Sequence, residues 1–500
     1  MFEGIVEGFS VALTAQNLLF VTLGVLIGTV VGLLPGLGPT AGVSLLLPLT
    51  FGLPASTAII FLAGIYYGTM YGGRIPAILI NMPGDASAVV TTFDGYPMRL
   101  QGRAGPALAI TAIGSFVGGT IAIVGLTVLA PIVARYAARV GPPELFMLTL
   151  FGIFLVAIIG SGSKVRAFSL AALGLLIGTI GVDAMSGQTR LTYGNYDLAS
   201  GISIVAIAVG LFGLSEVFYA IDTRLGAEGV DTKLGRLFPT MDDWVRSRWA
   251  MVRAAIVGFF IGVVPGGGGT VSSIVAYGLE KKISKEPSRF GKGAVEGLTA
   301  TETADNASSN ASFIPLLTLG LPPNSVLAVM FGALLMHNVP PGPGLIEQHP
   351  DIFWGVIASM YIGNLLLLIL NLPLVGVFVQ ILRVPPAFLN AIIVIIAVAG
   401  LYSINHKLYD IIVALVFGVI GYALKKWKFD LAPLILAFIL APMMEVQFRR
   451  SMIMGDGELG IFVYRPFSAL MVILLVGLAG MLAWGAIRGD KSAPAEANIR

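Results

Sequence analysis

The chain has 500 residues, of which 56% are hydrophobic and 11% are charged, and its net charge is +3. Soluble domains carry about 25% charged residues. This composition, with a mean hydropathy of +0.90, therefore excludes an ordinary soluble protein and indicates one that lies in a membrane. The sequence has no cysteine, which excludes disulfides, thiolate nucleophiles and cysteine-based zinc sites.

Apolar residues form continuous blocks along the chain. Continuous blocks are typical of membrane helices, because the strands of a membrane barrel alternate apolar and polar residues. In chain order the blocks fall near residues 17–34, 41–53, 55–73, 105–134, 143–160, 165–182, 201–221, 250–264, 270–280, 299–320, 322–337, 352–382, 387–404, 408–424, 429–444 and 460–487. We expect an all-α polytopic membrane protein with roughly 11 to 14 membrane segments, counting the short ones.

A long polar stretch near the middle of the chain separates two groups of apolar blocks. We therefore expect a first membrane repeat over residues 1–222, a cytoplasmic linker over 223–249, and a second membrane repeat over 250–488. The last residues, 489–500, are polar and predict a disordered tail.

Two pairs of related segments support this division. GTVVGLLPGLGPT (residues 28–40) shares six of 13 positions with GFFIGVVPGGGGT (258–270), and IPAILINMPGD (75–85) resembles IPLLTLGLPPN (314–324) in the same order. Interrupted hydrophobic segments at matching places in two halves are typical of transporter repeats. Lys and Arg flank the second glycine-rich interruption on both sides, whereas none occurs before Arg74. The positive-inside tendency then predicts inverted repeats, each with a broken helix that forms a re-entrant hairpin.

The hairpin tips have the composition of an anion-binding site. Proline ends the first half-helix, glycines permit the turn, and Thr40 or Thr270 is expected to cap the second half-helix. A helix that begins inside the membrane presents free N–H groups and a positive dipole end to a carboxylate. The predicted substrate-binding residues are Pro35, Gly36, Gly38, Thr40, Pro265, Gly266, Gly267, Gly268, Gly269, Thr270 and Ser272, together with Arg74.

There are other interpretations for Arg74, for the glycines spaced by four residues and for the tip at Thr270. Arg74 could instead neutralise Asp85, or it could extend its guanidinium to the membrane surface. For Gly28, Gly32, Gly258 and Gly262, which are spaced by four residues, close helix packing is the preferred interpretation. A nucleotide-binding loop is not expected, because the lysine of the Walker pattern is missing before Thr270.

A second polar cluster lies in TATETADNASSNASFIP (residues 299–315). Polar and acidic side chains inside an apolar span indicate function, and oxygen-rich groups suit Na⁺ while a carboxylate suits H⁺. The predicted coupling-ion residues are Asp305, Asn306, Ser309 and Asn310, with Asn81 and Asp85 of the first half. Glu302 is expected in the headgroup region, where acidic residues are ordinary. We predict no metal beyond Na⁺ and no cofactor.

Together the quoted motifs resemble the large membrane subunit, of TctA type, of the tripartite tricarboxylate transporters. The resemblance covers GLLPGLGPTAGVSLLLPLTFGLP, IPAILINMPGD, VVPGGGGTVSS and TETADNASSNASFIPLLTLGLPPNS. It implies a multi-pass protein of the bacterial inner membrane that imports carboxylates such as citrate by symport with Na⁺ or H⁺. It also implies two partners, a small four-helix membrane subunit and a periplasmic solute-binding protein.

We therefore expect a secondary transporter, not an enzyme, whose partners are these subunits, a small carboxylate and the lipid bilayer, with no nucleic acid. The main alternative is a passive anion channel, which could use the same broken helices. A further alternative is an intramembrane aspartyl enzyme with Asp85 and Asp305 as its two carboxylates.

Overall fold

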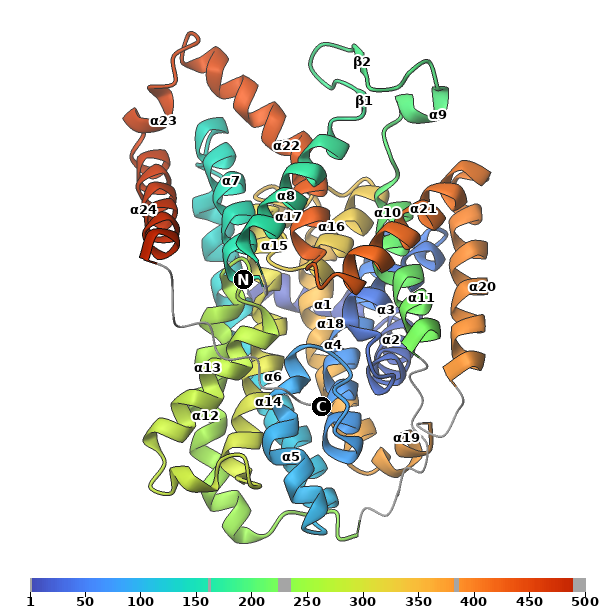
Figure 1. Cartoon of the computed structure of the whole chain (residues 1–500), viewed down its shortest axis with the longest axis vertical. Helices are drawn as coiled ribbons and strands as arrows, with labels where there is room; N and C mark the ends of the chain where they lie inside the picture. The colour runs from blue at the N-terminus through green and yellow to red at the C-terminus, as the bar shows by residue number, and fades with distance from the viewer. Residues whose placement is uncertain (1, 161–162, 224–234, 382–385, 489–500) are drawn as a thin grey trace.

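The computed structural model describes residues 2–160, 163–223, 235–381 and 386–488, and it shows an all-α protein with one small β-hairpin (Figure 1). The hairpin consists of β1 (Gly181–Val182) and β2 (Thr189–Arg190), which pair antiparallel. The helices of the first half are α1 (Phe2–Ala12), α2 (Ala15–Leu33), α3 (Gly38–Leu46), η1 (Leu47–Thr50), α4 (Ala55–Ile80), η2 (Ser87–Val89), α5 (Thr91–Leu100), α6 (Ala104–Ala137), α7 (Pro142–Ile159), α8 (Lys164–Gly178), α9 (Tyr196–Ala199), α10 (Ile204–Ala208), η3 (Val209–Leu214) and α11 (Ser215–Thr223).

The second half continues the same architecture. Its helices are α12 (Met241–Val263), α13 (Gly268–Ile283), η4 (Pro287–Arg289), α14 (Val295–Ala311), α15 (Phe313–Leu319), α16 (Ser325–Met336), α17 (Leu345–Gln348), α18 (Pro350–Asn371), α19 (Val375–Ile381), α20 (Pro386–Asn405), α21 (Leu408–Lys426), α22 (Ala432–Met454), α23 (Ile461–Tyr464) and α24 (Pro466–Arg488). The prediction of an all-α polytopic membrane protein is confirmed.

Seven helices of the described chain are long and apolar enough to cross a bilayer by themselves. They are α2, α6, α7, the continuous run from α10 to α11, α18, α21 and α22. Shorter apolar helices, such as α16, accompany them. The expected total of 11 to 14 segments includes short ones whose depth depends on the bilayer, so it stays a prediction.

Both glycine-rich tips break a helix in the same way. α2 ends at Leu33 and α12 at Val263, each followed by an extended residue and a proline. Gly36 and Gly266 then take positive φ angles of 88° and 79°, a region that only glycine occupies without strain. α3 and α13 begin at Gly38 and Gly268. The predicted helix breaks are confirmed at both sites.

The predicted caps are wrong. Thr40 and Thr270 are the third residues of α3 and α13, and neither helix has a side-chain cap. The glycine turn lets each helix start two residues earlier than the threonine, with Leu37 and Gly267 at the cap positions in helical conformation. The Thr40 hydroxyl instead lies 2.9 Å from the Ser325 hydroxyl in the other half.

The second pair of related segments also shares its local geometry. Asn81 ends α4 and Gly320 ends α15, both in the left-handed conformation, and the next residue in each case donates its N–H to the carbonyl of a proline six positions earlier. Asp85 and Asn324 then each accept a backbone N–H from the third residue after them. The local structure therefore recurs at both breaks, while an inverted relation between the two complete halves stays a prediction.

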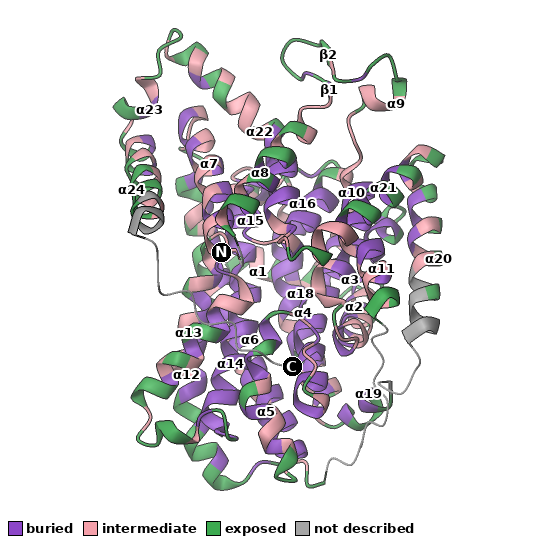
Figure 2. Cartoon of the chain, viewed as in Figure 1, coloured by how far each residue is buried: buried purple, intermediate pink, exposed green. Residues whose placement is uncertain are grey.

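α4 and α14 are buried almost throughout, whereas α24 carries mainly exposed residues (Figure 2). Glycines allow the closest helix contacts. A Cβ atom at Gly28 or Gly32 would meet carbonyl oxygens of α4, and one at Gly258 or Gly262 would meet carbonyl oxygens of α14. The packing interpretation of these four glycines is confirmed.

The division into two membrane repeats with a cytoplasmic linker over 223–249 stays a prediction, although part of that range is helical. α12 begins at Met241, inside that range, because Thr240 and Asp243 form a capping box and Arg103 pairs with Asp243. The sequence hid this helix start because its first turns carry several charged residues. Residues 224–234 of the linker and the predicted tail 489–500 lie outside the described residues.

Candidate functional site

Each glycine tip contacts the second break of the opposite half. Thr40, at the start of α3, pairs with Ser325, which opens α16. At the other tip, a Cβ atom at Gly269 would lie 3.2 Å from Ser87 Cβ, where η2 begins. The backbone N–H of Gly266 donates to the carbonyl of Pro323 at 2.8 Å. The structure thus brings both tips and both breaks together, although they are far apart in the sequence.

Two aspartates lie at this junction. The Asp85 carboxylate accepts a hydrogen bond from the Ser87 hydroxyl at 2.9 Å and from the Ala88 N–H at 3.0 Å. Ser87 also interacts with the carboxylate of Asp305. A Cβ atom at Gly38 would lie 3.9 Å from Asp85 Cβ. Asp85, Ser87 and Asp305 therefore connect the first tip with the second.

Asp305 points directly at the second tip. Its Oδ1 atom occupies the space that a Cβ atom of Gly269 would need. Asp305 is 3% exposed, and within the described residues Oδ1 has no hydrogen-bond partner. The first turn of α13 presents free N–H groups and a positive dipole end at this place. The tip can therefore hold a carboxylate, and the chain's own Asp305 lies against it.

Arg74 and Glu302 extend the cluster into the core. Arg74 is fully buried on α4, with its guanidinium 5.1 Å from the ring centre of Tyr71. In the described part of the chain, none of its guanidinium nitrogens has a hydrogen-bond partner. Glu302 is 2% exposed, accepts a hydrogen bond from Thr91, and is an electrostatic neighbour of Arg74. This burial excludes the alternative in which Arg74 extends to the membrane surface. Glu302, expected in the headgroup region, lies in the protein core.

The remaining polar residues of α14 are buried and tied mainly to the helix itself. Asn306 donates to the Ser115 hydroxyl of α6 at 2.9 Å, and its Oδ1 has no partner among the described residues. Ser309 donates to the Asp305 carbonyl and Asn310 to the Asn306 carbonyl. Among the described residues no three His, Asp or Glu side chains are arranged to hold a metal ion. A cation here would need hydroxyl, amide and carbonyl oxygens as additional ligands.

The structure does not bring every predicted residue together. Asn81 ends α4 with an exposed side chain, and the Ser272 hydroxyl donates to the Gly269 carbonyl within its own helix. Sequence reasoning missed Ser87, Ser325 and Tyr66, whose hydroxyl accepts a hydrogen bond from Asn324 at 3.3 Å. Serine and tyrosine in an apolar chain give too weak a signal for such contacts to be predicted.

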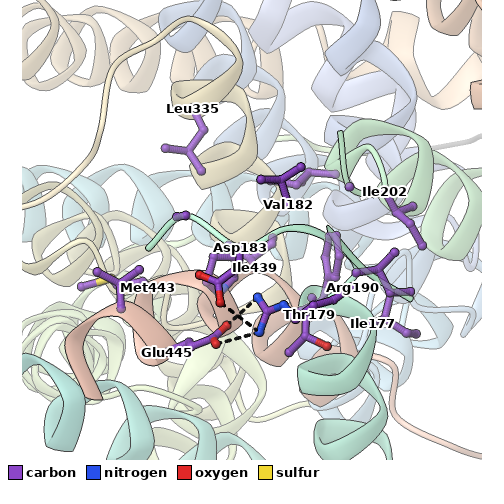
Figure 3. Close-up of a pocket in the computed structure, with 18 of the residues that line it drawn as sticks. Ile177, Thr179, Val182, Asp183, Arg190, Ile202, Leu335, Ile439, Met443 and Glu445 are labelled. Atoms are coloured by element: carbon purple, nitrogen blue, oxygen red, sulfur yellow. Dashed lines mark hydrogen bonds and ion pairs between the residues drawn. The ribbon is translucent and has the colours of Figure 1, made fainter. Parts of the chain in front are cut away.

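A cavity of about 790 Å³ lies elsewhere, between the end of α8, the 181–201 segment, α16 and α22 (Figure 3). Asp183, Arg190 and Glu445 converge in its wall. Arg190 pairs with both carboxylate oxygens of Glu445, at 2.7 and 2.9 Å. Arg449 pairs with Asp183 at 2.7 Å and with Glu445 at 2.7 Å. This cavity contains none of the predicted site residues.

Comparisons with known proteins agree with the motifs that form the tips and α14. Residues 18–436 match the family described as "Tripartite tricarboxylate transporter TctA family". An uncharacterized 52.8 kDa protein of Agrobacterium vitis, in the TAR-I ttuC' 3' region, is 44% identical over 472 residues, which cover 94% of each chain. A second uncharacterized protein of that organism, in the TAR-II ttuC' 3' region, is 46% identical over 215 residues, covering 43% of this chain and 89% of the relative. No solved structure matches the chain. The chain belongs to the tripartite tricarboxylate transporter TctA family, and it is therefore a multi-pass membrane component of a transport system with other subunits.

Proposed function

We propose that the chain is an ion-gradient-driven secondary transporter that imports organic carboxylates across the bacterial inner membrane. It works with a small four-helix membrane subunit and with a periplasmic solute-binding protein that delivers the substrate. One observation carries the proposal. Two broken helices from separate halves of the chain meet at the same pair of carboxylates, Asp85 and Asp305.

The start of α13 is proposed to hold a carboxylate of the substrate. Because Gly269 has no side chain, an oxygen atom can reach its backbone. Asp305 Oδ1 already does so. Arg74 is the second candidate for the substrate, because a buried guanidinium without a partner is costly and suits a carboxylate that binds through two oxygens. The other predicted tip residues would offer backbone groups to the substrate, and Thr40 and Thr270 would offer their hydroxyl groups.

The electrostatics of the cluster support a coupling cation. Asp85, Glu302 and Asp305 are three neighbouring carboxylates, and the guanidinium of Arg74 is an electrostatic neighbour of Glu302. When all four groups are ionised the cluster carries an excess of negative charge, which repels an anionic substrate. A Na⁺ or a proton bound at Asp305, with Asn306, Ser309 and Asn310 on the same helix, reduces this repulsion. By linkage, the ion and the substrate then favour each other's binding.

The two alternatives receive less support. A passive anion channel gives no role to the buried carboxylates. An aspartyl enzyme needs two carboxylates aimed at a peptide, whereas the family is one of transporter components.

The test is uptake of labelled carboxylates by proteoliposomes that contain this chain and its small membrane partner. An inward Na⁺ gradient or a pH gradient is imposed, with the cognate binding protein present or absent. We expect accumulation above the external concentration that requires one gradient and the binding protein. Equilibration without accumulation under both gradients would contradict the proposal and favour a channel.

A further inference from the structure

The 181–201 segment, which contains β1, β2 and α9, has an unusual distribution of side chains. Its three charged residues are Asp183, Arg190 and Asp197, and all of them pair with other parts of the chain. Beside several small polar residues, the segment exposes five apolar or aromatic side chains. They are Val182, Met185, Leu191, Tyr193 and Tyr196, which are 52%, 42%, 43%, 90% and 92% exposed.

The charged groups of the segment are engaged in ion pairs, whereas its two tyrosines are almost fully exposed. Arg190 is bound to Glu445 of α22 through two hydrogen bonds, and Asp183 to Arg449 of the same helix. Asp197 pairs with Lys407 at 2.9 Å. These contacts hold the segment in one position, as the converging side chains in Figure 3 illustrate. The two exposed tyrosines are therefore presented on an anchored support.

The backbone at Tyr193 and two residues before it is strained. Leu191 and Tyr193 have φ angles of +55° and +48°, a region that bulky side chains rarely adopt. Such strain persists where the surrounding structure imposes it, often at functional positions. Here the bidentate pair of Arg190 lies directly before the strained residues. The Tyr193 side chain at this place is exposed and makes little contact with its own chain.

The position of the segment indicates the side of the membrane on which it lies. β1, β2 and α9 stand beyond the ends of α8, α10 and α21, at the opposite end of the molecule from α12 and α13 (Figure 1). The Lys- and Arg-rich loop 281–292 follows α13. The positive-inside tendency assigns that loop to the cytoplasm, so the 181–201 segment lies on the extracytoplasmic side.

We propose that the 181–201 segment is the docking site for the soluble solute-binding protein of this tripartite system, with Tyr193 and Tyr196 as its anchors. The inference rests on the proposed function. Exposed tyrosines are typical anchors of protein interfaces, because they combine a large apolar surface with a polar group and lose little conformational freedom. The cavity beneath the segment opens beside the docking site, between α8, α16 and α22.

The test measures uptake by proteoliposomes as a function of binding-protein concentration. The variant is Tyr193→Ser combined with Tyr196→Ser, and the matched control is Tyr464→Ser, an 80% exposed tyrosine of α23 outside the segment. We expect the double variant to raise the binding-protein concentration for half-maximal uptake by about tenfold or more, with maximal uptake unchanged. The control variant should leave both values unchanged.

A second measurement separates docking from misfolding and from lipid contact. Because the chain has no cysteine, Tyr193→Cys provides a single site for maleimide labelling. We expect rapid labelling in proteoliposomes that contain the complete membrane complex, and protection when the binding protein is added. Slow labelling without the binding protein would assign Tyr193 to the lipid headgroups and overturn the proposal.

The two proposals fail in different ways. Wild-type uptake that depends on the binding protein, combined with no shift in the double variant and no protection of the cysteine, overturns the docking site alone. Wild-type liposomes that accumulate no carboxylate contradict the proposed function itself.

Discussion

At the residue scale, the candidate site depends on a close contact between the Asp305 carboxylate and Gly269. The Asp305 carboxylate occupies the space that the Cβ atom of any other residue at position 269 would need. Glycine is therefore required at this position by the approach of a carboxylate and not by its φ angle, since only Gly266 and Gly268 of the tip have positive φ.

Gly269→Ala should abolish coupled uptake while leaving the fold intact. The added methyl group displaces Asp305 from the start of α13, and a misplacement of about 1 Å in a site can lower a rate by about 100-fold. Uptake into proteoliposomes and thermal unfolding in detergent are the two measurements. Gly278→Ala is the matched control, because it lies on the same helix and no atom lies within 4 Å of its added Cβ. Equal uptake by both variants would contradict the assignment.

Asp305→Asn should separate substrate exchange from ion coupling. The amide keeps the shape of the side chain but removes one of the negative charges that the coupling cation neutralises. We expect exchange of labelled for unlabelled substrate to persist, and gradient-driven accumulation to fall to simple equilibration. Counterflow and gradient-driven uptake in the same liposomes measure the two activities. Accumulation at the wild-type level would exclude Asp305 as the coupling residue.

At the element scale, the packing of α12 against α14 positions the second tip. Gly258 and Gly262 lie against carbonyl groups of Ala304 and Ser308, on either side of Asp305 in α14. The Ser312 hydroxyl donates to the Gly262 carbonyl at 3.1 Å. The same glycines that bring the helices together therefore set the distance between the tip and the buried carboxylate.

Gly262→Ala should destabilise the protein. Its Cβ would lie 2.7 Å from Ser308 Cα, so α12 must move away from α14, and overpacking of this kind costs about 1–3 kcal/mol. An exposed glycine to alanine change in a helix stabilises by roughly 0.5–1 kcal/mol, which is the expectation for Gly278→Ala. Thermal unfolding of the detergent-solubilised protein should therefore move in opposite directions for the two variants. A Gly262→Ala variant as stable as the wild type would show that the two helices can separate without cost.

At the scale of the whole molecule, contacts between the two halves cross over. The start of α3 meets the start of α16, and the start of α13 meets η2. The site is therefore shared between halves, and neither half contains it alone. At one end of the molecule, the ion pairs of Asp183, Arg190, Glu445 and Arg449 hold the 181–201 segment to α22 in a similar way.

The attachment of this segment should depend on pH only in acid. The N–H groups of Met185 and Ser186 and the Arg449 guanidinium hold the pKa of Asp183 well below its usual range. The ionised form is favoured in the folded state. The stabilisation is therefore complete above the ordinary aspartate pKa of about 3.9 and is lost as the pH falls below it towards the lowered pKa.

A spin label at Gln188→Cys, attached at neutral pH, measures this directly. We expect constant, low mobility between about pH 8 and pH 5, and increasing mobility as the pH falls below about 4, because protons then bind the detached form of Asp183 and favour release of the segment. The Asp183→Asn variant, carrying the same label, should be mobile at every pH. A mobility change centred between pH 5 and pH 7 would indicate that a group other than Asp183 controls the attachment.

The sequence determined the fold class, the position of both helix breaks and the identity of the polar helix. Continuous apolar blocks admit only helices in lipid, and the Pro-Gly tips at residues 35–38 and 265–268 cannot continue a helix. Spacing by four also identified the packing glycines, since residues four apart share a helix face. These are local properties, which depend on neighbouring residues and not on residues far away in the sequence.

Only the tertiary structure decided which of these parts meet. The pairing of Thr40 with Ser325, the contact of Gly269 with Asp305, and the burial of Glu302 beside Arg74 join residues whose separation in the chain carries no sign of contact. The threonine caps were wrong because the glycine turn moved each helix start. The tips, α14 and the second breaks form one site because helix packing brings the two halves together, and a single sequence contains no record of that packing.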